Sequence, residues 1–268
     1  MNTKIGFIGA GNMGGALARA AAKSAAPENI YLADQLAEKA QALAEDLGCN
    51  TATGTQIAES CDFIFLGVKP QVMADMLSQI APVLAQRTDS FTLVSMAAGV
   101  SMKDIGAMAG GNYPIIRIMP NLPVSVGSGM ILYDVTNTVT EETINAFCKV
   151  LSFAGLLDRL PEKLIDAGSA LSGCGPAFVC LFVEALADGA VACGLPREQA
   201  VRYAEQTLAG TAKMLLQNGQ HPGALKDAVC SPGGSTIAGV GALEQGGFRA
   251  SVMDAVASAY RRTLELGK

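Results

Sequence analysis

The amino-acid sequence predicts an α/β protein in two parts, a doubly wound parallel sheet followed by a domain built of helices alone. Short apolar runs alternate with helical stretches from Lys4 to about Leu160, and a glycine-rich turn follows the first of those runs. After Pro161 the strand signal disappears. The predicted division therefore places residues 1–161 in the sheet-containing domain and residues 162–268 in the helical domain.

Five apolar runs are predicted to form the strands of the sheet. Such runs are typical of strands buried on both faces, and helices of about 10 to 15 residues fit between them. Parallel neighbours need crossover connections of this kind, so the pattern is that of a Rossmann-type fold. The five runs are Lys4–Gly9, Asn29–Asp34, Asp62–Gly67, Phe91–Met96 and Ile115–Met119.

The C-terminal part of the sequence is rich in alanine and leucine and poor in charge. Helices are predicted over about Pro176–Cys193, Arg197–Gln217 and Phe248–Gly267, each bounded by glycine or proline. Between Glu205 and Lys213 there is no charged residue, so the apolar surface of these helices exceeds a single core-facing stripe. Helices of this kind usually bury against another chain, which predicts a homo-oligomer.

Composition and charge exclude several functional classes. The chain has 268 residues, half of them hydrophobic, and a formal net charge of -5, so it is predicted to be globular. Neither half offers the basic face that nucleic acid requires, and no nucleic-acid partner is expected. The longest stretch without charge, Ala167–Val183, is interrupted by glycines and a proline and is shorter than a membrane span. No membrane-spanning helix is therefore expected.

The cysteines and the first residues bear on the cellular compartment. Seven scattered cysteines, never spaced C-x-x-C, fit reduced thiols better than a disulfide framework or a zinc site, and no metal is expected. Met1–Lys4 run into a short strand pattern rather than the apolar core of a secretion signal. The protein is expected to be cytoplasmic.

The motif Gly9-Ala10-Gly11-Asn12-Met13-Gly14 follows the first predicted strand directly after Ile8 and opens a helix predicted over Gly15–Lys23. Gly9 permits the tight turn, Gly11 lets backbone N–H groups approach a pyrophosphate, and Gly14 allows close packing of helix and strand. The motif predicts a dinucleotide site. The alternative is a glycine-rich turn with no ligand.

Asp34 ends the second predicted strand, 20 residues beyond Gly14. An acidic side chain at this place accepts hydrogen bonds from the adenosine ribose, which by itself favours NADH. The nearest cation that follows is Lys39, so no arginine compensates a 2′-phosphate. The alternative is that Asp34 caps a helix. The sequence leaves the choice between NADPH and NADH open.

Two further loops follow predicted strands, where open α/β sheets bind ligands. They are Val68-Lys69-Pro70 and Ser95-Met96-Ala97-Ala98-Gly99, and the candidate cofactor residues of the second are Met96, Ala97 and Ala98. The small residues of the second loop leave room for a nicotinamide ribose. Alternatively, Lys69 and Pro70 only start a helix, since proline is favoured in the first turn.

The segment Ser231-Pro232-Gly233-Gly234-Ser235-Thr236 is polar and glycine-rich and leads into a helix predicted over Ile237–Leu243. Consecutive N–H groups of Gly233, Gly234, Ser235 and Thr236 at a helix start can bind a carboxylate, and the Ser231 and Thr236 hydroxyls can add hydrogen bonds. The alternative is a helix capped by Ser235.

His221 is the only histidine, and it lies in the turn Gly219–Gly223. A Ser-His-Asp or Cys-His system would have to be built on it, and no G-x-S-x-G motif is present. The histidine is therefore predicted to have a structural or solvent-facing role.

Taken together, the motifs of the chain closely resemble the pyrroline-5-carboxylate reductase family, along essentially the whole sequence. The segment Ser231–Thr236 is the most specific of them. The others are the glycine motif, Val68-Lys69-Pro70, Arg117-Ile118-Met119-Pro120-Asn121 and Leu171-Ser172-Gly173-Cys174-Gly175-Pro176-Ala177.

The resemblance implies that NADPH or NADH reduces 1-pyrroline-5-carboxylate to proline. It implies that Thr236 hydrogen-bonds the substrate ring nitrogen, that the backbone of Gly234–Thr236 holds the carboxylate, and that Glu162 lies near the same pocket. It further implies that Ile8–Met13, Lys69 and Met96–Ala98 line the cofactor. A homodimer, and a decamer made of five dimers, are also implied.

Two other functional classes share a dinucleotide-binding domain. A β-hydroxyacid dehydrogenase would need a lysine on the first long helix of the second domain, and no lysine lies between Lys163 and Lys213. A non-catalytic dinucleotide-binding regulator would keep the glycine motif but have no use for Ser231–Thr236.

Overall fold

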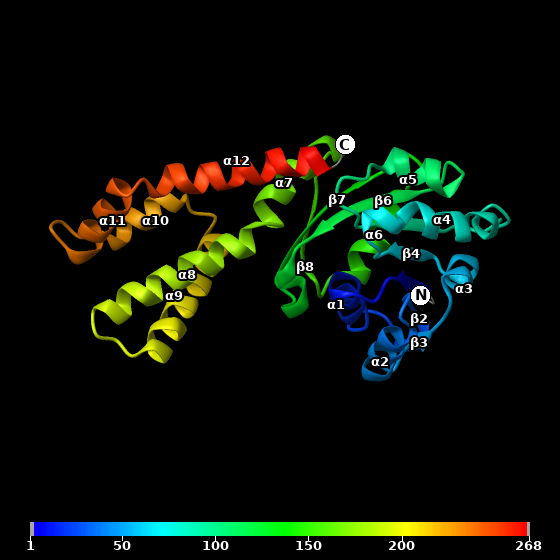
Figure 1. The fold of residues 1–268 in the computed structure, drawn as a ribbon, viewed down its shortest axis with the longest axis horizontal. Helices are drawn as coiled ribbons and strands as arrows, with labels where there is room; N and C mark the ends of the chain where they lie inside the picture. Colours follow the sequence, from blue (N-terminus) through cyan, green and yellow to red (C-terminus); the bar gives the residue numbers. More distant parts are fainter. Residues whose placement is uncertain (1–2, 267–268) are drawn as a thin grey trace. The chain divides into compact units, whose positions relative to one another are not determined.

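The computed structural model describes residues 3–266 (Figure 1). The chain divides into two compact units, one comprising the chain up to Cys174 together with the residues from Ala259 onward, and the other comprising Gly175–Ser258. The boundary expected from the sequence, between residues 161 and 162, falls at the start of a helix of the first unit. Residues 1, 2, 267 and 268, including the expected end of the last helix at Gly267, lie outside the described residues.

Within the described residues, a sheet of eight strands forms the centre of the first unit. Its order is β3-β2-β1-β4-β5-β6-β7-β8, so the chain winds outward from β1 in both directions. All pairs from β3 to β6 are parallel, which confirms the five predicted strands and their arrangement. The strands are β1 (Ile5–Ile8), β2 (Ile30–Ala33), β3 (Asn50–Thr51), β4 (Phe63–Leu66), β5 (Thr92–Ser95), β6 (Ile115–Pro120), β7 (Gly129–Val135) and β8 (Gly155–Arg159).

One strand pair departs from the parallel arrangement, because β7 pairs with β6 in the antiparallel sense. A parallel neighbour needs a connection of a dozen or more residues. Here β6 and β7 are joined by a short segment that holds only the 3-10 helix η2 (Leu122–Val126). β8 returns parallel to β7 after the crossover helix α6 (Glu141–Val150).

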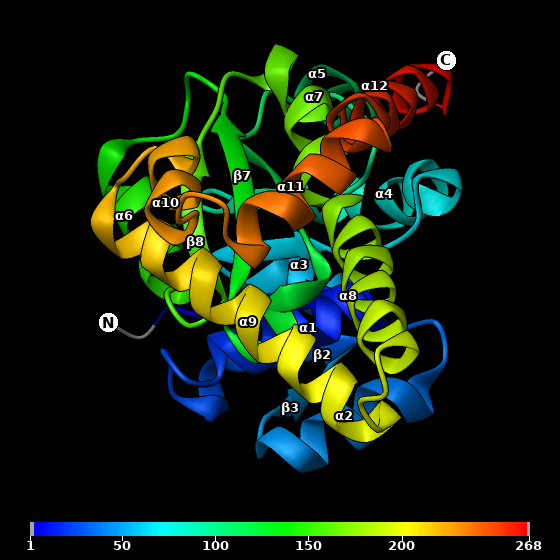
Figure 2. The same cartoon turned by 90° about the vertical axis from the view of Figure 1, so that its left-hand side faces the viewer.

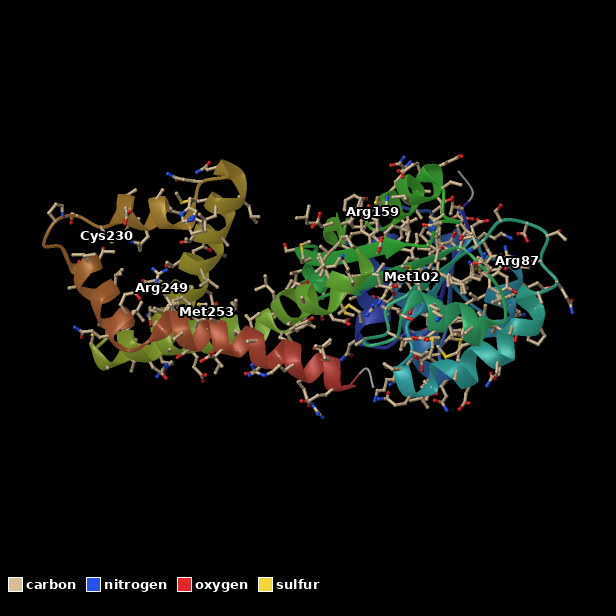
Figure 3. All side chains as sticks on the ribbon, turned by 90° about the horizontal axis from the view of Figure 1, so that it is seen from above. Arg87, Met102, Arg159, Cys230, Arg249 and Met253 are labelled. Atoms are coloured by element: carbon tan, nitrogen blue, oxygen red, sulfur yellow. The ribbon has the colours of Figure 1, made fainter. Side chains whose placement is uncertain are left out.

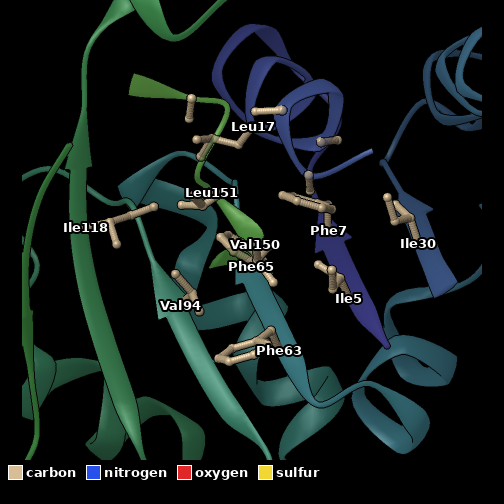
Figure 4. Close-up of a cluster of buried hydrophobic side chains, with 14 of the residues drawn as sticks. Ile5, Phe7, Leu17, Ile30, Phe63, Phe65, Val94, Ile118, Val150 and Leu151 are labelled. Atoms are coloured by element: carbon tan, nitrogen blue, oxygen red, sulfur yellow. The ribbon is translucent and has the colours of Figure 1, made fainter. Parts of the chain in front are cut away.

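One face of the sheet is covered by α1 (Asn12–Ala21), α2 (Ala37–Leu47) and α6. Figure 4 shows the buried cluster there, in which Leu17 of α1 lies over side chains of β1 and β4. The rings of Phe7 and Phe65 stack with centroids 4.5 Å apart. Burial of each such large apolar side chain contributes about 1.5 to 3 kcal/mol.

The opposite face is covered by α3 (Gly54–Ser60), α4 (Pro70–Leu84) and α5 (Met102–Ala109). Alternate strand residues such as Ile64 and Leu93 point to this side, as the period of two in a strand requires. The carboxyl ends of the parallel strands are thus held by helices on both faces of the sheet.

The helix α7 (Glu162–Ser172) packs across β6 and β7 within the first unit. Its Ile165 forms a small buried cluster with Met119 and Leu132. The approach is close at Gly168, where a Cβ atom would lie 2.4 Å from Leu132 Cδ1.

The second unit contains helices only, within the part that the structure describes (Figure 2). The helix expected over Pro176–Cys193, and those that follow it, are confirmed to within two residues at each described end, and α8 packs along α9. The helices are α8 (Gly175–Ala192), α9 (Arg197–Asn218), α10 (Pro222–Val229), α11 (Ser235–Gln245) and α12 (Phe248–Leu266), the last of which continues into residues of the first unit.

Large apolar side chains of these helices are exposed in the single chain, among them Leu181 (66%) and Met253 (71%, labelled in Figure 3). By length and composition alone, one described stretch, Glu162–Ala192, is apolar enough to cross a membrane. The sequence predicted no membrane-spanning helix because glycines and a proline interrupt this stretch. Its mean hydropathy nevertheless remains in the range of membrane-spanning helices. An exposed apolar surface of this kind is typical of an interaction site.

Candidate dinucleotide site and the glycine-rich turn

Three of the predicted cofactor loops lie at one edge of the sheet. They follow β1, β4 and β5, which are consecutive neighbours in the strand order. Because the strands are parallel, their carboxyl ends meet at the same edge. The structure therefore brings together Gly9–Gly14, Val68-Lys69-Pro70 and Met96-Ala97-Ala98.

The three motif glycines have different surroundings. Gly9 has φ +109°, and a Cβ atom there would lie 2.4 Å from the carbonyl oxygen of Gly67. At Gly14 a Cβ atom would lie 2.0 Å from the carbonyl oxygen of Gly9. At both positions a side chain would collide with the backbone of the protein itself. At Gly11, by contrast, a Cβ atom would have no protein atom within 4 Å.

Gly11 is therefore the glycine that the fold itself does not need. It is the N-cap residue of α1, with φ -70° and ψ -168° and no side-chain cap, so any L residue could adopt its conformation. The open space lies where the unpaired N–H groups of the first helical turn attract an anion. The arrangement fits a pyrophosphate, as predicted for this motif.

A cavity of about 460 Å³ adjoins the motif and is lined by Gly11, Asn12 and Gly15 of α1 and by Lys39 of α2, among others. Arg19 also lines it, with its guanidinium paired to Asp46. The Lys39 ammonium thus supplies positive charge beside the glycine motif.

Asp34, directly after β2, uses both carboxylate oxygens. Oδ2 accepts the Ala10 N–H at 2.8 Å and Oδ1 accepts the Leu36 N–H at 3.0 Å. The carboxylate does not cap a helix, since the N-cap residue of α2 is Leu36 and no side chain caps it. Asp34 therefore ties the end of β2 to the glycine motif and still has lone pairs for further donors.

The loop after β4 starts a helix, as the alternative proposed. Pro70 is the first residue of α4 and Lys69 is its N-cap, without a side-chain cap. Lys69 is exposed, so the helix start leaves its ammonium group available.

The loop after β5 begins in a buried position. Ala97 is 2% exposed, and its N–H lies 3.4 Å from Oγ of the fully buried Ser95. Met96 is half-buried and Ala98 is exposed. Only the far part of this loop is thus open to a ligand.

The glycine-rich turn of the second unit joins α10 to α11. Gly233 has φ +69°, and the Gly234 N–H donates to the Ser231 carbonyl oxygen at 3.1 Å. A Cβ atom on Gly234 would lie 2.4 Å from Ser231 Oγ, so a side chain there would displace the serine hydroxyl. The turn packs tightly on itself at Ser231.

The alternative in which Ser235 caps α11 is wrong, because the N-cap is Gly234 and no side chain caps the helix. Ser235 and Thr236 are the first two helical residues and both are exposed. N–H groups in a first helical turn have no partner within the helix. The start of α11 therefore offers N–H donors beside the Thr236 hydroxyl.

His221 has the structural role that the sequence predicts. Its Nδ1 accepts the Gly223 N–H at 3.0 Å and so caps α10. Within residues 3–266, no group of three or more histidine, cysteine, aspartate or glutamate side chains is arranged to hold a metal ion.

Glu162 lies in the first unit at the start of α7. Its Oε1 accepts the Met102 N–H at 2.7 Å and lies 3.4 Å from Arg117 Nη1. It also lines a larger cavity of about 730 Å³ between α5 and the segment 135–138, and of the predicted site residues only Glu162 does so.

Arg117 belongs to a motif that carries the family resemblance, but the sequence assigned no role to it. Its side chain is 4% exposed and its Nη2 lies 2.9 Å from Asp166 Oδ1. The available signal was a single charge in the otherwise apolar run Ile115–Met119. Charged residues are almost never fully buried unless they are paired.

Known protein families match both parts of the chain. Residues 162–266 match the family described as pyrroline-5-carboxylate reductase dimerisation. Residues 4–99 match the family described as NADP oxidoreductase, coenzyme F420-dependent.

The pyrroline-5-carboxylate reductase of Escherichia coli strain K12 is 41% identical over 271 aligned residues, covering 100% of both chains. This chain belongs to the pyrroline-5-carboxylate reductase family. The solved Coxiella burnetii reductase has a TM-score of 0.93 at 31% identity, covering 100% of both chains. The Plasmodium falciparum pyrroline carboxylate reductase, solved with NADP bound, has a TM-score of 0.86 at 32% identity, covering 100% of this chain and 99% of that one.

Membership in the pyrroline-5-carboxylate reductase family confirms the resemblance found in the sequence. It also confirms the fold class of a Rossmann-type sheet with a helical dimerisation domain.

Proposed function

We propose that this chain is a pyrroline-5-carboxylate reductase, which reduces 1-pyrroline-5-carboxylate to L-proline with NADPH or NADH. The observation that carries the proposal is full-length similarity to reductases of that name. The glycine motif of the first unit and the turn Ser231–Thr236 of the second supply the two binding elements that such a reaction needs.

The proposed cofactor site is formed by the three loops at the carboxyl ends of β1, β4 and β5, together with Asp34. The open space at Gly11 supports it, because a Cβ atom there would intrude only on a ligand. The proposed residues are Ile8, Gly9, Ala10, Gly11, Asn12, Met13, Gly14, Asp34, Val68, Lys69, Pro70, Met96, Ala97 and Ala98.

The proposed substrate site is the start of α11. The N–H groups of Gly234, Ser235 and Thr236 would hold the substrate carboxylate, because a helix N-terminus favours an anion. Ser231, Gly233 and Glu162 complete the set that the family resemblance implies.

Imine reduction needs no nucleophile and no metal, so orientation and fixed dipoles can carry it. The bound reduced nicotinamide supplies the hydride. We assign to the Thr236 hydroxyl a hydrogen bond to the ring nitrogen. This hydrogen bond holds a proton at the nitrogen, whose charge changes when the imine is reduced. Thr236 is thus the proposed catalytic residue, and the rest of the turn orients the ring.

The closest rival activity is that of a β-hydroxyacid dehydrogenase. That chemistry moves a hydroxyl proton through a lysine, and α8 and α9 up to Lys213 contain none. The exposed hydroxyl of Thr236 suits a hydrogen bond to an imine nitrogen better than general base chemistry at an alcohol.

We further propose a homodimer formed through the helical region, located in the cytoplasm, and a decamer of five dimers as the larger assembly. The exposed apolar side chains of α8 and α12 support a second copy as the partner. The dimerisation-family match over residues 162–266 covers both of these helices.

The test of the proposed site compares wild type, Thr236→Ala and Thr236→Ser. The alanine variant is expected to lose about 100-fold or more in kcat, since it lacks the hydroxyl, whereas serine restores most of it. Cofactor dissociation constants should stay unchanged in both variants. Unchanged turnover in Thr236→Ala would remove the assigned role.

A further inference from the structure

The motif Arg117–Asn121 is one of those on which the family resemblance rests, but the proposed reaction assigns no role to it. Arg117 is buried at 4% side-chain exposure, with one carboxylate at each end of its guanidinium group. Its Nη2 lies 2.9 Å from Asp166 Oδ1, and its Nη1 lies 3.4 Å from Glu162 Oε1. Both carboxylates belong to the first two turns of α7.

Asn121 holds the other end of the same helix. Its Nδ2 donates to the Ser172 carbonyl oxygen at 2.9 Å, and its Oδ1 accepts the Met130 N–H at 2.9 Å. Met119, between Arg117 and Asn121, packs on Ile165, which lies between Glu162 and Asp166 in the N-terminal half of α7. Arg117 and Met119 of β6 thus hold the N-terminal half of α7, and Asn121, directly after β6, holds its C-terminal end.

Glu162 connects Arg117 to the loop after β5. Its Oε1 accepts the N–H of Met102, which is the first residue of α5 and is labelled in Figure 3. The preceding residue, Ser101, caps α5 by accepting the Asp104 N–H at 3.1 Å. The end of the loop 96–101 is therefore fixed by its own helix cap and by a carboxylate that Arg117 orients.

Stability alone does not account for Arg117. Replacing a buried ion pair by apolar residues is often neutral or stabilising. Moreover, Nε of Arg117 has no hydrogen-bond partner, the one such buried side-chain atom among the described residues. A local rule broken without an evident structural gain is typical of functional sites.

We propose that Arg117 is a positioning residue for the loop 96–101. It orients Glu162, which in turn fixes the Met102 end of the loop. The inference rests on the proposed function, with this loop beside the nicotinamide ribose, for which its small residues leave room. Glu162 then acts on the cofactor loop, in addition to the place near the substrate that the family resemblance implies.

The experiment compares Arg117→Met with a matched control, Arg87→Met. Arg87 is equally buried at 4%, donates to the Ala58 and Cys61 carbonyl oxygens, and pairs with Asp89; it is labelled in Figure 3. None of its partners belongs to the proposed site. Dissociation constants are measured for NADH, NADPH and ADP, which lacks the nicotinamide.

For Arg117→Met, we expect both reduced dinucleotides to bind about tenfold or more weakly and kcat to fall by about 100-fold, while ADP binding stays within about twofold. Arg87→Met should leave all three dissociation constants unchanged. Equal behaviour of the two variants would overturn the proposal. Equal loss of ADP and dinucleotide binding in Arg117→Met would also overturn it, since that indicates general disruption.

Glu162 supplies a second pair of variants at a partly exposed position. Glu162→Gln keeps an oxygen that can accept the Met102 N–H, so dinucleotide binding should stay near wild type, whereas Glu162→Ala should behave as Arg117→Met does. If Glu162→Ala instead raised only the KM of the substrate, Glu162 would be a substrate contact and the proposal would fail.

The binding measurements need no substrate, which separates the two proposals. Unchanged binding in Arg117→Met, with an active wild type, overturns only the role of Arg117. A wild type that binds dinucleotide but reduces no imine overturns the proposed reaction, and the comparison of Arg117→Met with Arg87→Met still decides the positioning role.

Discussion

At the scale of single residues, Gly11 and Gly14 separate ligand binding from folding. Gly11→Ala places a methyl group where no protein atom lies within 4 Å, so stability should stay within about 0.5 kcal/mol while dinucleotide binding weakens about tenfold or more. Gly14→Ala meets the Gly9 carbonyl oxygen at 2.0 Å and should lower the free energy of unfolding by about 2 kcal/mol or more.

Urea unfolding and calorimetric titration with NADPH measure the two effects. We expect Gly11→Ala to weaken cofactor binding without loss of stability, and Gly14→Ala to lower stability. Unchanged cofactor binding in Gly11→Ala would mean that the space beside Gly11 is not used by the pyrophosphate.

Asp34 bears on the choice between NADH and NADPH. A carboxylate beside the adenosine ribose repels a 2′-phosphate. Two cations line the adjoining cavity, Lys39 and Arg19, and Arg19 is paired with Asp46. Asp34→Asn removes the charge but keeps an oxygen for the Ala10 N–H. The ratio of kcat/KM for NADPH to that for NADH should rise about tenfold or more.

Steady-state kinetics with both cofactors measure this ratio, with Lys39→Ala as the opposite change, which should lower it. If the ratio in Asp34→Asn stays at its wild-type value, Asp34 does not determine cofactor choice. Its role is then the structural hydrogen bond to the glycine motif.

The contacts of Arg117 show what the sequence could not give at this scale. Its lone charge in an apolar strand was visible, but its partners Glu162 and Asp166 lie 45 and 49 residues further along the chain. Their meeting depends on how α7 docks on β6, and no local pattern encodes that. The glycine motif, by contrast, is local and was readable directly.

At the scale of elements, strands buried on both faces were predictable and the others were not. β1 and β4 are wholly buried and are unbroken apolar runs, and β6 is equally buried and apolar except for Arg117. β8 is mostly exposed and contains Asp158 and Arg159, and β3 has two residues, so neither carries such a signal. β7 is antiparallel because the connection from β6, which holds only η2, is too short for a parallel crossover. The apolar pattern of the strands alone does not predict this.

The helix α3 provides a pH-dependent test of element packing. Burial raises the pKa of the Cys61 thiol, which ends α3, from its ordinary 9.0 to about 11. The unfolded chain loses this proton first as the pH rises. The stability that the neutral thiol contributes is therefore complete below about pH 9 and is lost as the pH rises through about 11.

Urea unfolding at about pH 8 and about pH 10.5 should show wild type losing on the order of 2 kcal/mol more than Cys61→Ala between the two conditions. Cys61→Ala retains every other titrating group and therefore serves as the control for wild type. Equal losses in the two proteins would contradict the burial of a neutral thiol beneath β1.

At the scale of the whole molecule, the exposed apolar helices predict how the chain assembles. Leu181→Glu, on α8, puts a charge into a surface that is 66% exposed in the single chain, and it should shift the protein toward single chains of 27.5 kDa. Leu122→Glu is the matched control, because Leu122 is 64% exposed but lies outside the dimerisation match of residues 162–266.

Light scattering after gel filtration gives the mass of each variant. Wild type and Leu122→Glu should share one mass, an even multiple of the single chain. A wild type at the mass of one chain, or equal behaviour of the two variants, would contradict assembly through the helical region.

The central claim is that this chain reduces a cyclic imine with a nicotinamide cofactor. Its most direct test follows the loss of reduced-cofactor absorbance with 1-pyrroline-5-carboxylate, for NADPH and NADH in parallel, with a 3-oxoacid as the control substrate. The account predicts that only the imine is reduced, with one proline formed for each cofactor oxidised. Turnover of the oxoacid, or no turnover of the imine with either cofactor, would contradict it.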